Sequence, residues 1–157
     1  MGASCFFIGH REAGKDVFPL LVEAVEKHIT DYGVADFYVG HYGGFDWLAA
    51  QAVEDARERH PEIRLTLVLP YHLAIRPINT PKRFNGTYYP WEEERIPKRL
   101  AIIKTNQRMV DTCDYLITYA YHFLGGTGQI VEYARKREKR GLIHVENLAA
   151  KMRESAL

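Results

Sequence analysis

The sequence predicts an α/β domain in which five parallel strands form a sheet between two layers of helices. Short apolar runs alternate along the chain with stretches whose apolar residues recur at helical spacing. Glycines follow three of the apolar runs. Strands that alternate with helices form parallel sheets covered on both faces, and 157 residues suffice for one such core. We therefore expect a single three-layer domain over residues 1–157.

The composition of the chain argues against several classes of function. Hydrophobic residues make up 46% and charged residues 26% of the chain, as in globular proteins, and the net charge is +1. A chain this close to neutrality does not hold duplex nucleic acid by bulk electrostatics, and it contains no apolar run of membrane-spanning length. Cys5 and Cys113 lie in apolar segments without neighbours at metal-ligand spacing, which predicts buried, reduced thiols. We expect a cytoplasmic protein without a secretory leader.

The first half of the chain contains three predicted strands. Residues 4–9 form an apolar run that ends at Gly9 and leads into His10 and Arg11. A helix follows, with Asp16 as its cap. Residues 36–40 form the second strand, and a loop with Gly43 and Gly44 leads into a helix rich in alanine. Residues 64–70 form the third strand.

Asp46 has two interpretations. An aspartate just before a helical run is a favoured N-cap residue. In the alternative, its carboxylate contacts a ribose hydroxyl or a metal ion.

Residues 71–95 show no helical or strand period and contain Pro77, Pro81 and Pro90. A loop of this length is unusual in a compact domain unless it acts as a lid or a binding loop, so we expect an insertion or lid here. The aromatic side chains of Tyr88, Tyr89 and Trp91 either stack on a base or pack onto the body or a second subunit. Glu92 to Glu94 are predicted to face solvent near the next helix start.

The second half begins with a helix that Pro97 opens, with Leu100, Ile103 and Val110 on its apolar side. Residues 115–119 form a strand buried on both faces. A glycine loop leads to a helix over residues 127–139 with Thr127 as N-cap, and a strand over 141–146 precedes a short terminal helix. The loop either binds an anion at the helix N-terminus or serves only as a turn.

Right-handed crossovers favour the Rossmann-like strand order 3-2-1-4-5. In this order the first and fourth strands are neighbours, at the point where ligands of such sheets bind. The glycine loops at Gly9, at Gly43–Gly44 and at Gly125–Gly126 then meet at one edge of the sheet. Three converging glycine loops predict a ligand that carries phosphate.

Four histidines follow strands: His10, His41, His72 and His122. They hang from different loops and include no compact ligand pair, so we expect no metal ion and no separate cofactor. Hydrogen bonding to phosphate or stacking on a base is the favoured use.

The chain carries an ordered set of motifs: Gly9-His10-Arg11, Gly40 with Gly43 to Asp46, residues 106–114, and Gly125-Gly126-Thr127 leading to Glu132. This set resembles the SLOG superfamily, which is related to the Smf/DprA and Lonely-guy proteins, and within it the YspA-like branch. The resemblance implies a Rossmann-like fold that binds nucleotides or their derivatives. The superfamily includes Lonely-guy phosphoribohydrolases, DprA proteins that bind single-stranded DNA, and sensing modules of bacterial defence systems.

The match to the hydrolases is partial. Their Pro-Gly-Gly-x-Gly-Thr-x-x-Glu motif corresponds to residues 124–132, where Leu124 replaces proline and Gln129 replaces threonine. They also carry an arginine four residues before the methionine that Met109 matches, and here that position is Thr105.

Three functional hypotheses follow. The first is a sensor or signalling domain that binds a nucleotide-derived small molecule through Gly9, His10, Arg11, Gly43, Gly44, Asp46, Asn106, Gly125, Gly126, Thr127 and Gly128. The second is an enzyme that cleaves an N-glycosidic bond, with Glu132 stabilising the cation or activating water and Arg108 or Arg11 holding phosphate. The third is a module that binds single-stranded nucleic acid or protein through residues 71–95. Among partners we also expect a second copy of the chain in a homodimer.

Overall fold

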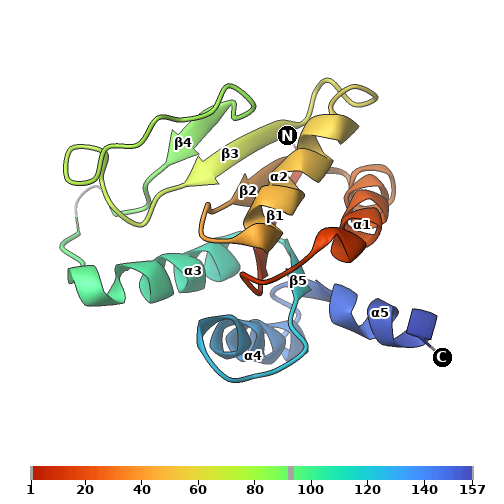
Figure 1. The fold of residues 1–157 in the computed structure, drawn as a ribbon. Helices are drawn as coiled ribbons and strands as arrows, with labels where there is room; N and C mark the ends of the chain where they lie inside the picture. Colours follow the sequence, from red (N-terminus) through yellow and green to blue (C-terminus); the bar gives the residue numbers. More distant parts are fainter. Residues whose placement is uncertain (1, 92–93, 157) are drawn as a thin grey trace.

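The structure is a computed structural model that describes residues 2–91 and 94–156, the last four of these as backbone only. Its centre is one parallel sheet of six strands in the order β4-β3-β2-β1-β5-β6 (Figure 1). The strands are β1 (Ala3–Gly9), β2 (Val34–Val39), β3 (Arg64–Val68), β4 (Gly86–Tyr88), β5 (Tyr115–Tyr119) and β6 (His144–Asn147).

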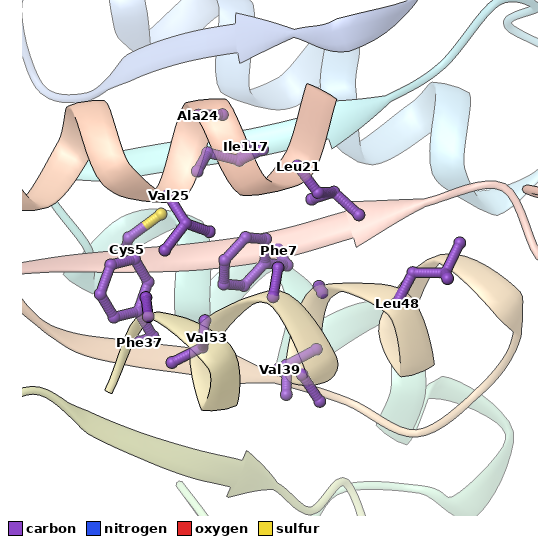
Figure 2. Close-up of a cluster of buried hydrophobic side chains, with 14 of the residues drawn as sticks. Cys5, Phe7, Leu21, Ala24, Val25, Phe37, Val39, Leu48, Val53 and Ile117 are labelled. Atoms are coloured by element: carbon purple, nitrogen blue, oxygen red, sulfur yellow. The ribbon is translucent and has the colours of Figure 1, made fainter. Parts of the chain in front are cut away.

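The helices cover both faces of this sheet. They are η1 (Lys15–Val17), α1 (Phe18–Thr30), α2 (Gly44–Ala56), η2 (Lys98–Leu100), α3 (Ala101–Thr112), α4 (Gly126–Lys139) and α5 (Leu148–Ala156). Phe7 of β1 packs with α1 and α2, and Figure 2 shows its ring among side chains such as Val25 and Val53. Phe6 points to the other face, where it packs with Met109 of α3 and Ile130 of α4. The three-layer, Rossmann-like architecture is therefore as the sequence predicts.

The five predicted strands occur in the predicted relative order, β3-β2-β1-β5-β6, but the sheet has a sixth strand that the sequence analysis missed. This strand, β4, lies inside residues 71–95 and pairs with β3 at the edge of the sheet. With 3 residues, of which Thr87 and Tyr88 are exposed, it is too short to show a period.

Trp91 is one residue of this segment that packs onto the body of the protein. This side chain is 6% exposed, and its indole N–H donates to the Thr105 hydroxyl on α3 at 2.8 Å. Trp91 therefore packs onto the body, the second of its two interpretations. Glu92 and Glu93 lie outside the described residues, and a role of the segment as a lid stays a prediction.

Helix α3 differs from the expected helix in its buried side. Its buried residues are Ala101, Thr105, Met109 and Val110, whereas Ile103 is 40% exposed. The expectation was wrong for Ile103: it lies in the first turn of α3, seven residues before the buried Val110 and so on nearly the same face, but this end of the helix leaves it exposed.

Both cysteines are buried free thiols, and burial raises the pKa of Cys113 to about 12. In the described part of the chain, no helix is long and apolar enough to cross a bilayer.

We predict that Asn85 holds the sheet edge. Its side-chain oxygen accepts the backbone N–H of buried Leu65 at 2.8 Å and a guanidinium N–H of Arg57 at 2.7 Å. Asn85→Ala should lower the free energy of unfolding in urea by about 1–3 kcal/mol, because it leaves a buried donor without a partner. Asn85→Asp keeps the accepting oxygen and should stay within about 0.5 kcal/mol of wild type. Equal losses in both variants would contradict this account.

Candidate functional site

A cavity of about 390 Å³ lies at the carboxyl ends of β1, β2 and β3. The loops after these strands form part of its wall, and the first half of α3 and the loop between β5 and α4 complete it. This is the edge at which parallel α/β sheets bind ligands. The predicted residues that line it are Gly9, His10, Arg11, Gly43, Asp46, Asn106, Gly126 and Thr127.

Other predicted site residues lie outside the cavity wall. Gly44, Gly125 and Gly128 belong to the same glycine loops but do not line it. Glu132 is exposed on α4, past the first turn. Arg108 is turned toward Trp91 and Glu94: its guanidinium lies 4.5 Å from the Trp91 ring centre and 3.3 Å from a Glu94 carboxylate oxygen. The structure thus brings the glycine loops together and leaves Arg108 and Glu132 apart from the cavity.

The loop after β1 and the start of α2 touch backbone to backbone. The Gly44 N–H donates to the Arg11 carbonyl at 2.8 Å, and a Cβ at Gly44 would lie 2.8 Å from that same oxygen. A Cβ at Gly9 would lie 2.4 Å from the Phe45 ring. Glycine is required at both positions because no side chain fits between these segments.

Two helix N-termini face this region without a side-chain cap. Gly43 is the N-cap of α2, and Gly125, with a φ of +90°, is the N-cap of α4. Thr127 was predicted as that cap, which is wrong because α4 begins at Gly126, and the Thr127 hydroxyl instead donates to the Gly9 carbonyl at 3.3 Å. Uncapped first turns leave backbone N–H groups available for an anion, except the Gly44 N–H of α2, which donates to the Arg11 carbonyl.

Asp46 is the third residue of α2, so its prediction as N-cap is also wrong. Its carboxylate reaches back to accept the Tyr42 N–H at 3.0 Å, as an acidic residue in a helical first turn commonly does. Burial raises the pKa of Asp46 to about 6, against the opposing effects of that hydrogen bond and of the Arg11 charge. Asp46 is therefore a carboxyl group inside the cavity that changes its protonation near neutral pH.

The loop after β5 is tied to the loop after β1 through Tyr121. Its N–H donates to His10 Nε2 at 3.1 Å, and its hydroxyl donates to Glu12 at 2.9 Å. The His10 ring stacks on His122 with 4.0 Å between ring centres. Burial, followed by the nearby His122, lowers the pKa of His10, so its ring is neutral at pH 7.

His10, Glu12 and His122 offer ligand atoms within 4.8 Å of one another, close enough to consider a metal ion. The backbone N–H of Tyr121 already occupies the lone pair of His10, however, and stacked rings direct their lone pairs side by side rather than to one point. A metal ion would need this arrangement to change. His41 and His72 do not join the set: His41 lines a neighbouring cavity, and His72 accepts the Ala74 N–H.

Sequence reasoning missed several residues of the wall. Ile102 and Thr105 line the cavity from the same side of α3 as the predicted Asn106, and their helical spacing from Asn106 is a signal that would have grouped them with it. Glu12 also lines the cavity but carried no such signal, because the register of β1 against β5 brings its loop beside the loop of Tyr121, whose hydroxyl donates to it.

Comparisons with known proteins identify the fold. No protein-family model matches the chain, and no curated protein matches its sequence. The structure is similar to that of DNA processing protein A from Helicobacter pylori, which was described for its unique mode of binding single-stranded DNA. The TM-score is 0.58 with 14% sequence identity over 86% of this chain and 63% of that one, so the chain spans less than two thirds of that protein. At this identity the similarity shows the fold alone, and at that level it agrees with the Rossmann-like fold that the sequence predicts.

We predict that ionisation of Asp46 destabilises the fold. The unfolded state loses the Asp46 proton near the ordinary pKa of 3.8 and the folded state near about 6, so the cost develops between these values and persists at higher pH. Asp46→Asn should therefore gain stability relative to wild type as the pH rises from 4 to 7, by up to about 3 kcal/mol. Urea unfolding across this range measures the difference. A difference that does not depend on pH would contradict the raised pKa.

Proposed function

We propose that the protein binds a nucleotide or nucleotide-derived ligand at this cavity, as a sensor or signalling domain. One observation carries the proposal: two uncapped helix N-termini and the Arg11 side chain meet at a single cavity of about 390 Å³. Helix N-termini and guanidinium groups both attract phosphate, and here they come from three different loops.

The N-terminus of α4 supplies the main hydrogen-bond donors for a phosphate. In its first turn the Gln129 N–H already donates to the Gly125 carbonyl, and the N–H groups of Gly126 and Thr127 precede this ladder. A Cβ at Gly126 would meet nothing within 4 Å, so a phosphate can approach the backbone there. Arg11 is exposed, and no ion pair to its guanidinium occurs within residues 2–91 and 94–152.

The remaining wall suits a nucleoside. Asp46 and Asn106 can exchange hydrogen bonds with ribose hydroxyls, and Val68, Ile102 and Leu124 supply apolar surface for a base. Glu132 and Arg108, the residues expected to perform catalysis, do not line the cavity. This arrangement favours binding over turnover.

We predict that nucleoside monophosphates stabilise the protein and that the matching nucleosides without phosphate do so less. A ligand at 100 times its dissociation constant should add about 2.7 kcal/mol of stability. Arg11→Ala should weaken binding about tenfold or more by calorimetry, because a charged hydrogen bond is lost. Arg140→Ala, at the opposite end of α4, is the control and should bind as wild type.

If no nucleotide raises the melting temperature, the proposal is wrong. If a short oligodeoxythymidine binds more tightly than every mononucleotide, the hypothesis of a single-strand module replaces it.

A second candidate is hydrolysis of an N-glycosidic bond, which the raised pKa of Asp46 favours. A carboxyl group with a pKa of about 6 can donate a proton to a leaving base near neutral pH. In this reaction Asp46, rather than Glu132, is the carboxyl group inside the cavity.

For this candidate we predict that free base appears from a nucleoside monophosphate, that Asp46→Asn lowers the rate at least 100-fold, and that Glu132→Ala leaves it within about threefold. Chromatographic assay of released base measures all three. Absence of release from wild type would rule the activity out and leave the binding proposal intact.

A further inference from the structure

A second cavity of about 360 Å³ adjoins the first. Gly40, Gly43 and Asp46 line both cavities, so the loop between β2 and α2 is the partition between them. The other walls of the second cavity are the first turns of α2, the end of β3 and residues 78–84. Part of the segment 71–95 therefore encloses a cavity beside the proposed phosphate site.

The second cavity has the chemistry of a site for a flat heterocycle. Trp47, Ile78 and Phe84 are among its apolar walls, and the Trp47 side chain is 61% exposed. Arg83 lies with its guanidinium carbon 5.7 Å from the Trp47 ring centre, held by the Gln51 side-chain oxygen at 3.2 Å. An exposed indole beside an oriented guanidinium offers a stacking surface and hydrogen-bond donors. Any of the nucleobases can stack on such a surface, because each has a flat π-face.

The partition between the cavities is suited to an anionic link. The N-terminus of α2 begins there at Gly43 and Gly44, and a Cβ at Gly43 would lie 2.7 Å from the Arg11 Cα. The Arg11 backbone therefore packs directly against the partition. The Gly44 N–H is used by the Arg11 carbonyl, so the groups that favour phosphate between the two cavities are the dipole of α2, the N–H groups that follow Gly44 and the Arg11 side chain.

We propose that the second cavity binds a second nucleobase of the same ligand, which makes the ligand a dinucleotide: two nucleoside units joined through phosphate. This inference rests on the proposed function and names its ligand class. One base and ribose occupy the first cavity, the phosphates lie at the partition, and the second base stacks on Trp47. A mononucleotide leaves the second cavity empty.

The test compares mononucleotides with dinucleotides by isothermal titration calorimetry on the full chain. The probes are the four common nucleoside 5′-monophosphates and the four symmetrical dinucleoside diphosphates, in which two such units share a pyrophosphate. At least one dinucleotide should bind ten times more tightly than its own monophosphate. Trp47→Ala should weaken that dinucleotide at least fivefold, since stacking of a base on an aromatic ring is lost, and should leave the monophosphate within twofold.

Two further measurements distinguish the loss of aromatic stacking from a nonspecific effect of the Trp47 substitution on the fold. Trp47→Phe keeps an aromatic surface and should retain most of the gain. The chain has two tryptophans, and Trp91 is buried, so quenching of fluorescence by acrylamide reports mainly on Trp47. The dinucleotide should protect wild-type fluorescence from acrylamide, whereas the monophosphate should not, and Trp47→Phe should show no such protection.

The outcomes distinguish this inference from the proposed function. If monophosphate and dinucleotide bind equally, or if the gain survives Trp47→Ala, the second base site is wrong and the proposed function stands. If none of the eight compounds binds, both are wrong.

Discussion

The site depends on a contact between two backbones that leaves no room for a side chain. The start of α2 lies against the loop after β1, where the Gly44 N–H donates to the Arg11 carbonyl and the Phe45 ring covers Gly9. Glycine at such positions costs conformational entropy on folding, which the hydrogen bond and the buried ring offset. The consequence is positional: the α2 N-terminus and the Arg11 side chain are held at the same point of the sheet edge, although they belong to different βα units.

A second set of contacts joins the loop between β5 and α4 to the loop after β1. Tyr121 donates from its backbone to His10 and from its hydroxyl to Glu12, while Thr127 donates to the Gly9 carbonyl. Loops that are separated by more than one hundred residues thus form one hydrogen-bonded rim. A site whose donors are already placed loses little freedom when a ligand binds, so more of the contact energy remains for affinity.

The sequence allowed much of the architecture to be predicted, because hydrophobic period and right-handed crossovers leave few arrangements of alternating strands and helices. The convergence of the glycine loops followed from that order. Other features depend on contacts that no local pattern encodes. Strand β4 is placed by the hydrogen bonds of Asn85 to β3, and Arg108 is turned away by Trp91, which lies 17 residues earlier in the chain. The predicted caps Asp46 and Thr127 were wrong because α2 begins at Gly44 and α4 at Gly126, so that both residues lie inside the first turn and glycines occupy the N-cap positions.

Asp46 connects the electrostatics of the two cavities, because it lines both of them and lies at the partition. An ionised carboxylate there would oppose a phosphate, and the Arg11 charge offsets only part of that repulsion. Burial has already raised the pKa of Asp46 to about 6. The free energy needed to protonate this carboxyl group at neutral pH is therefore much smaller than for an ordinary aspartate, even before an anion binds. A phosphate bound at the partition, as proposed, would raise the pKa further, because a nearby like charge disfavours ionisation. Binding of that anion would therefore be coupled to uptake of a proton by Asp46, and the coupling would be strongest just above pH 6, where the free protein has lost that proton.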